Sequence, residues 1–358
     1  MRKAVLYICM LTGALCDSCS KPEKMQQVHF NNSYSLGGDP LGIEMAETSG
    51  LFAIDNYLIA SQFSGDHFLK VYDAATYHEL GSLAKKGSGV NEFPSIAIID
   101  QYERCGDDHC MWVHDLNKGE LIKINLTKSL RSQTTIVDQK VMTRSESRFH
   151  TAFYIDSLRV VGRSTNSTPQ MNRLQVYNPH SDLILKTVPL FPEIERARTE
   201  LDFVVNKYNT LYVSNIGIKP DKTRIASAMC SFDRIDIFKT DGELERSIFD
   251  GKEIPDNNIE YLDEIDSHKL QMYYGGIFTS DDYIYTLYYG QPFSEYGRSP
   301  IPTQIRIFNW SGNALCKIDV KDYLYNFTID EMNGVMYGVD IVNKRILKYN
   351  IKKILDEL

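Results

Sequence analysis

The stretch RIDIFKTDGELERSI, residues 234–248, decides the fold of this chain. Apolar and polar side chains alternate up to an aromatic residue, Phe238, and a polar turn with Asp241 and Gly242 precedes a second apolar run. Successive side chains of a strand point to opposite faces, so this pattern is typical of two half-buried strands joined by a tight turn. The stretch therefore predicts a β-hairpin.

The same hairpin pattern recurs along the chain. Clear copies are FLKVYDAATYHELGSL (68–83), RLQVYNPHSDLILKTV (173–188) and QIRIFNWSGNALCKI (304–318), and weaker copies are ELIKINLTKSL (120–130) and RILKYNIKKIL (345–355). Each copy has an apolar anchor before its turn, and the six anchors are Tyr72, Ile124, Tyr177, Phe238, Phe308 and Tyr349. A pattern that repeats about every fifty residues indicates a repeat architecture.

A second hairpin pattern lies upstream of each copy. Its six occurrences are LFAIDNYLIAS (51–61), SIAIIDQYERCGDDHCMWVHD (95–115), AFYIDSLRVVG (152–162), DFVVNKYNTLYVS (202–214), GIFTSDDYIYTLYYG (276–290) and FTIDEMNGVMYGVD (327–340). Two hairpins per unit make four strands, and six such units predict an all-β fold, a six-bladed β-propeller. Two separate β-sandwiches are the alternative interpretation.

The last unit holds only three strands. The segment QQVHFNNSYSL (26–36) also alternates and has no partner of its own. We expect it to supply the missing strand, so that an N-terminal strand in the last blade closes the propeller. Such closure removes the open sheet edges that invite aggregation.

The N-terminus indicates export. A basic start, Met1 to Lys3, precedes the apolar run AVLYICMLTGAL (4–15), which is too short to span a bilayer but typical of a secretory signal. The following Cys16-Asp17-Ser18-Cys19 resembles the cleavage region of a bacterial lipoprotein signal. An ordinary secretory signal, with both cysteines uninvolved, is the alternative.

The lipoprotein resemblance implies that Cys19 is lipidated, because a small residue, Ser18, precedes it. Ser20 follows the cysteine, and without an aspartate there the resemblance implies the outer membrane, with the protein facing the periplasm or the cell surface. The expected organisation is a signal peptide at 1–18, a tether at 19–27 and the propeller at 28–358. A lipid-modified cysteine anchors a protein firmly, since each buried methylene contributes about 0.8 kcal/mol.

Charge excludes one class of partner. The formal net charge is -8, and no run of lysine or arginine interrupts the acidic composition. A nucleic-acid surface needs a basic face that displaces counterions. We therefore expect no nucleic-acid partner.

Two segments carry a family resemblance. AKKGSGVNEFPS (84–95) and YYGGIFTSDDYIYTLYYG (273–290) resemble a turn and a hairpin of the TolB-like six-bladed propeller lipoproteins of Bacteroidetes. The resemblance implies a propeller fold and a cell-envelope location. It implies no particular activity.

Loop lengths indicate which face of the propeller binds. When the strands of a blade are lettered A to D from the channel outward, the long connections expected are B–C segments (215–233 and 290–303) and D–A segments (189–200 and 250–274). All four lie on one face, and long loops on a rigid scaffold usually carry function. Candidate contact residues for a protein or glycan partner are Arg196, Arg198, Tyr289, Tyr296 and Arg298. Alternatively, the tyrosines pack between blades and the charges are solvated.

The motif CGDDHC allows three interpretations. In an oxidising compartment, Cys105 and Cys110 favour a disulfide at a hairpin tip, with two free thiols or a metal site as the alternatives. The sequence does not decide whether Cys230 and Cys316 pair. The acidic insertion at 256–268 lacks the spacing of a calcium loop, so we expect no metal and no cofactor.

The sequence contains no G-x-S-x-G, H-E-x-x-H or phosphate-binding lysine motif. We therefore expect a non-catalytic envelope propeller that binds or scaffolds a protein or glycan partner. The alternative is an envelope hydrolase or lyase acting on a carbohydrate or lactone at the channel mouth. His150, Tyr154 and Asp281 are its candidate residues, although no spacing singles them out.

Overall fold

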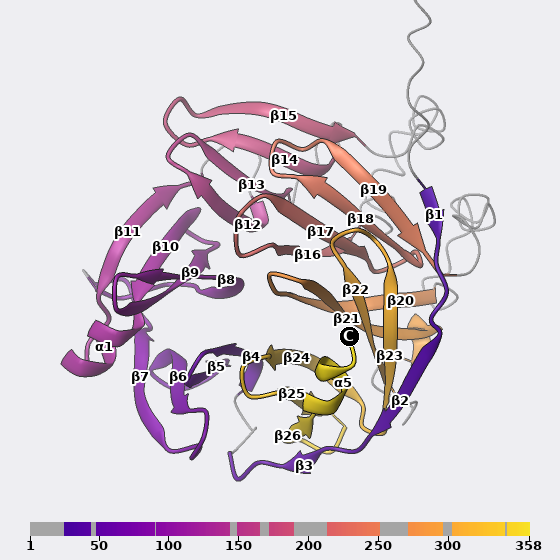
Figure 1. The fold of residues 1–358 in the computed structure, drawn as a ribbon. Helices are drawn as coiled ribbons and strands as arrows, with labels where there is room; N and C mark the ends of the chain where they lie inside the picture. The colour runs from indigo at the N-terminus through magenta and orange to yellow at the C-terminus, as the bar shows by residue number, and fades with distance from the viewer. Residues whose placement is uncertain are drawn as a thin grey trace, which may run out of the picture.

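Six small sheets stand around a central axis in the computed structural model of this protein, which confirms the predicted six-bladed β-propeller (Figure 1). The structure describes residues 25–43, 48–89, 91–143, 149–164, 172–189, 213–250, 271–295, 303–340 and 342–358. Each blade has four strands, A to D, with strand A nearest the axis, and two blades gain a fifth strand at the outer edge. The described residues include no helix with the length and apolar character needed to cross a membrane.

The first three blades each come from one continuous segment. Blade 1 holds β4 (Thr48–Ile54), β5 (Tyr57–Gln62), β6 (His67–Asp73) and β7 (Glu79–Lys85). Blade 2 holds β8 (Ala97–Cys105), β9 (Asp108–Asp115), β10 (Glu120–Asn125) and β11 (Val137–Met142). Blade 3 holds β12 (Phe149–Asp156), β13 (Arg159–Ser164), β14 (Asn172–Asn178) and β15 (Leu183–Pro189).

The other three blades take strands from the N-terminal segment as well. Blade 4 holds β16 (Ser214–Ile218), β17 (Arg224–Met229), β18 (Arg234–Lys239) and β19 (Leu244–Phe249), with β1 (Met25–Gln27) at its outer edge. Blade 5 holds β20 (Gln271–Thr279), β21 (Tyr283–Pro292), β22 (Thr303–Asn309) and β23 (Ala314–Val320), with β2 (Asn32–Leu36) outside them. Blade 6 holds β24 (Leu324–Asp330), β25 (Val335–Asp340), β26 (Arg345–Asn350) and β3 (Asp39–Pro40).

The six anchors of the repeat occupy equivalent places. Each is the last residue but one of its blade's third strand, and all six are buried: Tyr72, Ile124, Tyr177, Phe238, Phe308 and Tyr349. A buried apolar residue at a fixed strand position packs against the neighbouring blade, which explains why the sequence keeps this spacing.

Two repeat copies end in helices. The second half of ELIKINLTKSL forms α1 (Leu126–Ser132), and the C-terminal copy ends in α5 (Lys352–Asp356). Asn125 caps α1, because its side-chain oxygen accepts a hydrogen bond from the Lys128 backbone N–H at 2.9 Å. Strand β11 then begins only at Val137.

An N-terminal strand completes the last blade, as predicted, but it is not the strand expected. The fourth strand of blade 6 is β3, which pairs antiparallel with β26 through Asp39 and Pro40. Residues 26–36 instead give β1, parallel to β19, and β2, parallel to β23. An alternating pattern specifies a strand but not its partner, so the expected pairing of residues 26–36 was wrong. Residues 25–27, expected in the tether, belong to blade 4.

A glycine lets the N-terminal segment bend from blade 5 to blade 6. A Cβ atom at Gly38 would lie 2.6 Å from the Tyr349 ring, so only glycine fits there. The Gly38 backbone N–H donates to Asp322 Oδ2 at 3.1 Å, and the Tyr349 hydroxyl donates to the same oxygen at 2.9 Å. These contacts fix β3 beside β26.

Candidate functional site at the channel mouth

The connections of the blades define two faces. The A strands are β4, β8, β12, β16, β20 and β24. We call the face where they begin the D–A face, because the D–A and B–C connections reach it, and the opposite one the A–B face. The two longest connections between described strands follow β15 (residues 190–213) and β19 (250–270), and both start and end on the D–A face. The connections after β7 (86–96) and β21 (293–302) lie on the same face, whereas the connection after β10 (126–136), which contains α1, lies on the A–B face.

One predicted connection was wrong. Residues 215–233, expected to join strands B and C, contain most of the hairpin β16–β17. The hairpin expected at 202–214 lies outside the described residues, apart from its last two. Both segments carry two apolar runs around a polar turn, and a local pattern cannot decide which of them enters the ring.

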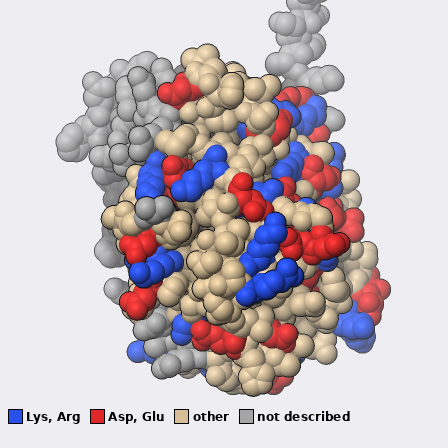
Figure 2. All heavy atoms as spheres, turned by 90° about the vertical axis from the view of Figure 1, so that its left-hand side faces the viewer, with Lys and Arg blue, Asp and Glu red and all other residues tan. Residues whose placement is uncertain are grey.

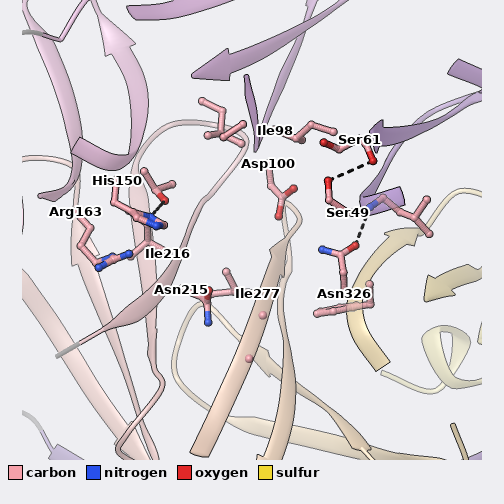
Figure 3. A pocket seen from close by; sticks show the side chains of 18 of the residues that line it. Ser49, Ser61, Ile98, Asp100, His150, Arg163, Asn215, Ile216, Ile277 and Asn326 are labelled. Atoms are coloured by element: carbon pink, nitrogen blue, oxygen red, sulfur yellow. Dashed lines mark hydrogen bonds between the residues drawn. The ribbon is translucent and has the colours of Figure 1, made fainter. Parts of the chain in front are cut away.

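A cavity of about 380 Å³ opens at the centre of the D–A face (Figure 3). All six A strands line it, five of them near their first residues and β20 farther along, through Gly275, Gly276 and Ile277. Its polar lining consists of Ser49, Ser61, Asp100, His150, Thr151, Arg163, Ser214, Asn215 and Asn326. The volume lies within the range of small-molecule sites, roughly 300–1,000 Å³.

β-Bulges shape this cavity. In five of the six blades the pairing of strands A and B shifts register. In blades 1, 2, 3 and 6 the shift lies near the start of the A strand, and in blade 5 it lies farther along, where the strand lines the cavity. The unpaired residues include Ser49, Asp100, His150 and Gly275, which all line the cavity. An extra residue in one strand re-aims side chains and frees backbone groups, and such bulges occur often beside binding sites.

Side chains clamp neighbouring A strands together around the cavity. The Gln101 amide donates to the Tyr154 carbonyl at 2.6 Å and accepts from the Tyr154 N–H at 2.9 Å. Asn326 accepts from the Leu51 N–H at 2.8 Å, and Asn215 donates to a carbonyl of β20 at 3.1 Å. These bonds replace strand pairing between blades, so the bulged residues are held rigidly.

Asp100 projects into the cavity from the bulge of β8 (Figure 3). Its half-buried carboxyl has no hydrogen-bond or ion-pair partner among the described residues. Burial raises the pKa of Asp100 to about 7, because the charged form is poorly solvated there. The carboxyl can therefore act as donor or acceptor near neutral pH.

Arg163 and His150 lie together on the blade 3 wall (Figure 3). The buried Nε of Arg163 has no hydrogen-bond partner, and burial lowers the pKa of its guanidinium. Enclosure by the cavity lowers the pKa of His150, and the charge of Arg163 lowers it further. His150 Nδ1 lies 3.1 Å from Thr151 Oγ1. At neutral pH the described residues of this wall thus carry a single positive charge, on Arg163.

The sequence prediction reached this cavity only in part. His150 lines it as expected for the channel mouth. Tyr154 instead stacks on Trp112 with ring centroids 4.6 Å apart, and Asp281 lies in the turn between β20 and β21 on the A–B face. Asp100 and Arg163 were missed, since each sits in an ordinary strand pattern and only the bulges bring them to the channel.

The predicted partner-binding residues have different outcomes. Tyr289 is buried and stacks on Tyr323 at 5.6 Å, and its hydroxyl donates to the Leu324 carbonyl at 2.9 Å, so it does not present its ring to a partner. The expectation for Tyr289 was wrong because β21 continues to Pro292 and turns this residue into the blade. Arg196, Arg198, Tyr296, Arg298 and the lipidation candidate Cys19 lie outside the described residues, as does the acidic insertion at 256–268.

A disulfide joins Cys105 and Cys110 across the β8–β9 hairpin, with Cα atoms 6.2 Å apart. Together with Asp138 they are the only group of three metal-ligating residue types within 4.8 Å of one another in the described part of the chain. The bonded sulfurs are not thiolates, so this group does not offer the ligands of a zinc site. Cys230 and Cys316 are free.

Exposed apolar side chains also lie on the D–A face. Four of them lie in B–C connections: Phe63, Leu116, Phe293 and Val342. Phe63 is 73% exposed and Val342 is 45% exposed. The A–B face also carries exposed apolar residues, among them Leu158 and Met332. On the side of the ring that lies at the left of Figure 1, acidic and basic side chains of the described residues intermix (Figure 2).

The fold and its cavity define a six-bladed propeller with a polar channel mouth. A family model described as TolB-like 6-blade propeller-like matches residues 51–332, and the chain belongs to this family. None of the curated proteins compared with the chain matches it.

Three solved structures are similar to this chain at low sequence identity. A member of the DUF4221 family from Bacteroides vulgatus has 12% identity and a TM-score of 0.55, covering 88% of this chain and 97% of that one. A Bacteroides fragilis protein, provisionally described as exported, has 10% identity and a TM-score of 0.49, covering 88% and 87%. The β-propeller domain of Cps50 (Swd1) from Myceliophteria thermophila has 9% identity and a TM-score of 0.46, covering 87% and 98%. The similarity to the Bacteroides vulgatus structure, at 12% identity, shows the fold alone.

Proposed function

We propose that this protein is a non-catalytic lipoprotein of the cell envelope, anchored through Cys19 in the outer membrane, that binds a protein or glycan partner through its D–A face. The observation that carries the proposal is the cavity at the centre of that face. Its lining includes Asp100 and Arg163, two polar side chains without partners among the described residues. Polar groups that stay unsatisfied in a buried setting are costly, which favours a ligand that satisfies them.

The direction of β1 supports an orientation in which the D–A face is directed away from the membrane. Strand β1 runs parallel to β19 from Met25, opposite Ser247, to Gln27, opposite Phe249. Because β19 ends at the D–A face, β1 points toward that face and Met25 is its end nearer the A–B face. An anchor ahead of Met25 would thus approach from the A–B side and leave the D–A face directed away from the membrane.

The surroundings of the cavity support a macromolecular partner. Phe63 and Val342 offer apolar contact area on the face that holds the polar cavity. Protein interfaces commonly combine such apolar contacts with a few oriented polar groups. A glycan would use the same combination, because sugar rings have both apolar faces and hydroxyl edges.

Charge placed on each face tests the proposal. Full-length protein with Phe63→Glu, and a matched variant with Leu158→Glu on the A–B face, would be cross-linked mildly in native membranes, and the captured partners identified by mass spectrometry. We expect one stoichiometric partner with wild type and Leu158→Glu, reduced several-fold by Phe63→Glu. Equal loss of the partner in both variants contradicts the proposal. So does a result in which neither the wild type nor the variants capture a partner.

A catalytic function is the second candidate, favoured by one observation. Asp100, with its pKa raised to about 7, shares the cavity with His150, whose pKa is lowered. A carboxyl with a pKa near 7 and a neutral imidazole in one cavity can serve as general acid and base. Turnover of a lactone or polysaccharide by purified protein, abolished by Asp100→Asn, would favour a hydrolase or lyase.

A further inference from the structure

We propose that the channel mouth binds a hydroxylated monocarboxylate, such as a uronic acid, with its carboxylate on Arg163 and its hydroxyl groups on Asp100, Asn215 and Asn326. This inference rests on the proposed function and names the ligand class of the same site. A glycan partner would then present an acidic sugar to the cavity.

The guanidinium of Arg163 requires an anion. It lines the cavity half-buried, forms no ion pair with any described residue, and has its buried Nε unpartnered. A buried charge without a partner is strongly unfavourable unless an opposite charge binds to it. The planar fork of a guanidinium matches the two oxygens of a carboxylate.

The charge balance of the cavity favours one negative charge over two. Among the described residues of the lining, Arg163 is the only basic side chain apart from His150, whose ring is neutral near pH 7 because its pKa is lowered. Asp100 shares the same space and carries part of a negative charge near that pH. A phosphate dianion would face one cation and one carboxyl, whereas a monocarboxylate is neutralised by Arg163 alone.

The remaining polar groups suit hydroxyl groups. The Nδ2 of Asn326 has no described partner and points toward the cavity, since its Oδ1 accepts from the Leu51 N–H (Figure 3). The Oδ1 of Asn215 is a corresponding acceptor, because its Nδ2 is engaged with the Tyr274 carbonyl. Hydroxyl groups donate and accept, so they can satisfy a carboxyl, an amide donor and an amide acceptor together.

Apolar side chains complete the site. Ile98, Ile216 and Ile277 lie around the cavity between the polar groups (Figure 3). Such side chains can contact the C–H face of a sugar ring. The volume of about 380 Å³ exceeds that of a simple anion, which indicates a ligand larger than acetate or phosphate.

Binding of glucuronate tests this inference in full-length protein purified in detergent. Isothermal titration would compare glucuronate with its uncharged isostere glucuronamide and with glucose 1-phosphate. The variants are Arg163→Gln, Asp100→Asn and the control Arg159→Gln, which changes an arginine of the same strand that pairs with Asp156 at the A–B face. Thermal melting would check that each variant folds.

We expect glucuronate to bind more tightly than either competitor, and Arg163→Gln to weaken it about 10- to 100-fold, as for loss of a charge-assisted hydrogen bond. Arg159→Gln should change the affinity less than twofold. Equal binding of glucuronate and glucuronamide, tighter binding of glucose 1-phosphate, an unchanged affinity in Arg163→Gln, or no binding of any of the three would overturn the inference. If glucuronate binding fails but the Phe63→Glu variant still captures less partner than wild type, the proposed function stands and only the ligand class is wrong. The failure of this inference and the failure of the proposed function can therefore be told apart.

Discussion

The side chain of Gln101 bonds to the backbone of Tyr154 in both directions, donating at 2.6 Å and accepting at 2.9 Å. Gln101 lies in the bulge of blade 2, and Tyr154 lies in the innermost strand of blade 3. The Gln101 side chain therefore makes the two backbone hydrogen bonds that a paired strand would make, and so links blades 2 and 3. This link holds the neighbouring Asp100 at the cavity.

Replacing this amide should loosen the channel mouth. We expect Gln101→Ala to lower the free energy of unfolding by about 1–3 kcal/mol, because two buried backbone groups of Tyr154 lose their partner. Urea denaturation measures the change. The control Gln139→Ala alters a half-buried glutamine in β11 of the same blade and should change stability by less than about 0.5 kcal/mol. Equal effects of both variants would argue against the clamp.

Asp100 should make the protein less stable as the pH rises. Its pKa in the folded protein, about 7, lies above the ordinary value of 3.8, so the folded state holds the proton more tightly than the unfolded state. Stability should therefore fall as the pH rises from about 4 to about 7 and stay level above that. We expect Asp100→Asn to remove this loss of stability. At pH 8 the free energy of unfolding of the variant should exceed that of wild type by about 2 kcal/mol, a value that allows for partial exposure of the side chain. At pH 4 the two proteins should differ little.

Urea denaturation at pH 4, 6 and 8 measures this dependence. Asp107→Asn, at the exposed turn of the same hairpin, is the control and should follow the wild-type profile. A wild-type protein whose stability rises steadily from pH 4 to pH 8, with Asp100→Asn parallel to it, would show that Asp100 ionises freely.

The disulfide should stabilise the β8–β9 hairpin. By loop-closure entropy, a bond between Cys105 and Cys110 contributes about 2 kcal/mol. We expect a reductant to lower the melting temperature of wild type and to leave the double variant Cys105→Ser/Cys110→Ser unchanged. Peptide mapping without reduction should find these two residues in one linked peptide. Labelling of both thiols in the untreated protein, or a stoichiometric zinc ion that copurifies with it, would contradict the pairing.

Tyr289 should act in folding and not in binding. Tyr289→Phe removes a hydroxyl that donates to a buried backbone carbonyl, so we expect a loss of about 1–2 kcal/mol in urea denaturation. Partner capture by the folded variant should equal that of wild type. A stable variant that no longer captures the partner would restore Tyr289 as a contact residue.

The repeat pattern was sufficient to predict the fold. The anchors Tyr72 to Tyr349 all mark the third strand of a blade, because one buried position per blade must recur for the ring to pack. The pairing of the N-terminal segment could not be predicted, since β1 and β2 add to blades already complete. Their partners are chosen by contacts distant in sequence, such as that between Phe30 and Phe308, whose rings lie 5.2 Å apart.

The candidate site was largely hidden from the sequence. His150 was the one cavity residue considered for the channel mouth, on general propeller geometry. Asp100 and Arg163 follow the alternation of ordinary strands, and the register shift at Asp100 depends on the Gln101 clamp to another blade. Bulges arise from such non-local contacts, and one sequence carries no local signal for them.

The central claim is that the D–A face binds the partner, and site-specific photo-crosslinking in living cells tests it most directly. A photoreactive amino acid would replace Phe63 or Val342 on the D–A face, and Leu158 or Met332 on the A–B face, all of them exposed side chains. The account predicts a discrete cross-linked product from both D–A positions and none from the A–B positions beyond lipid and abundant envelope proteins. A specific product from Leu158 and Met332, with none from Phe63 and Val342, would contradict it.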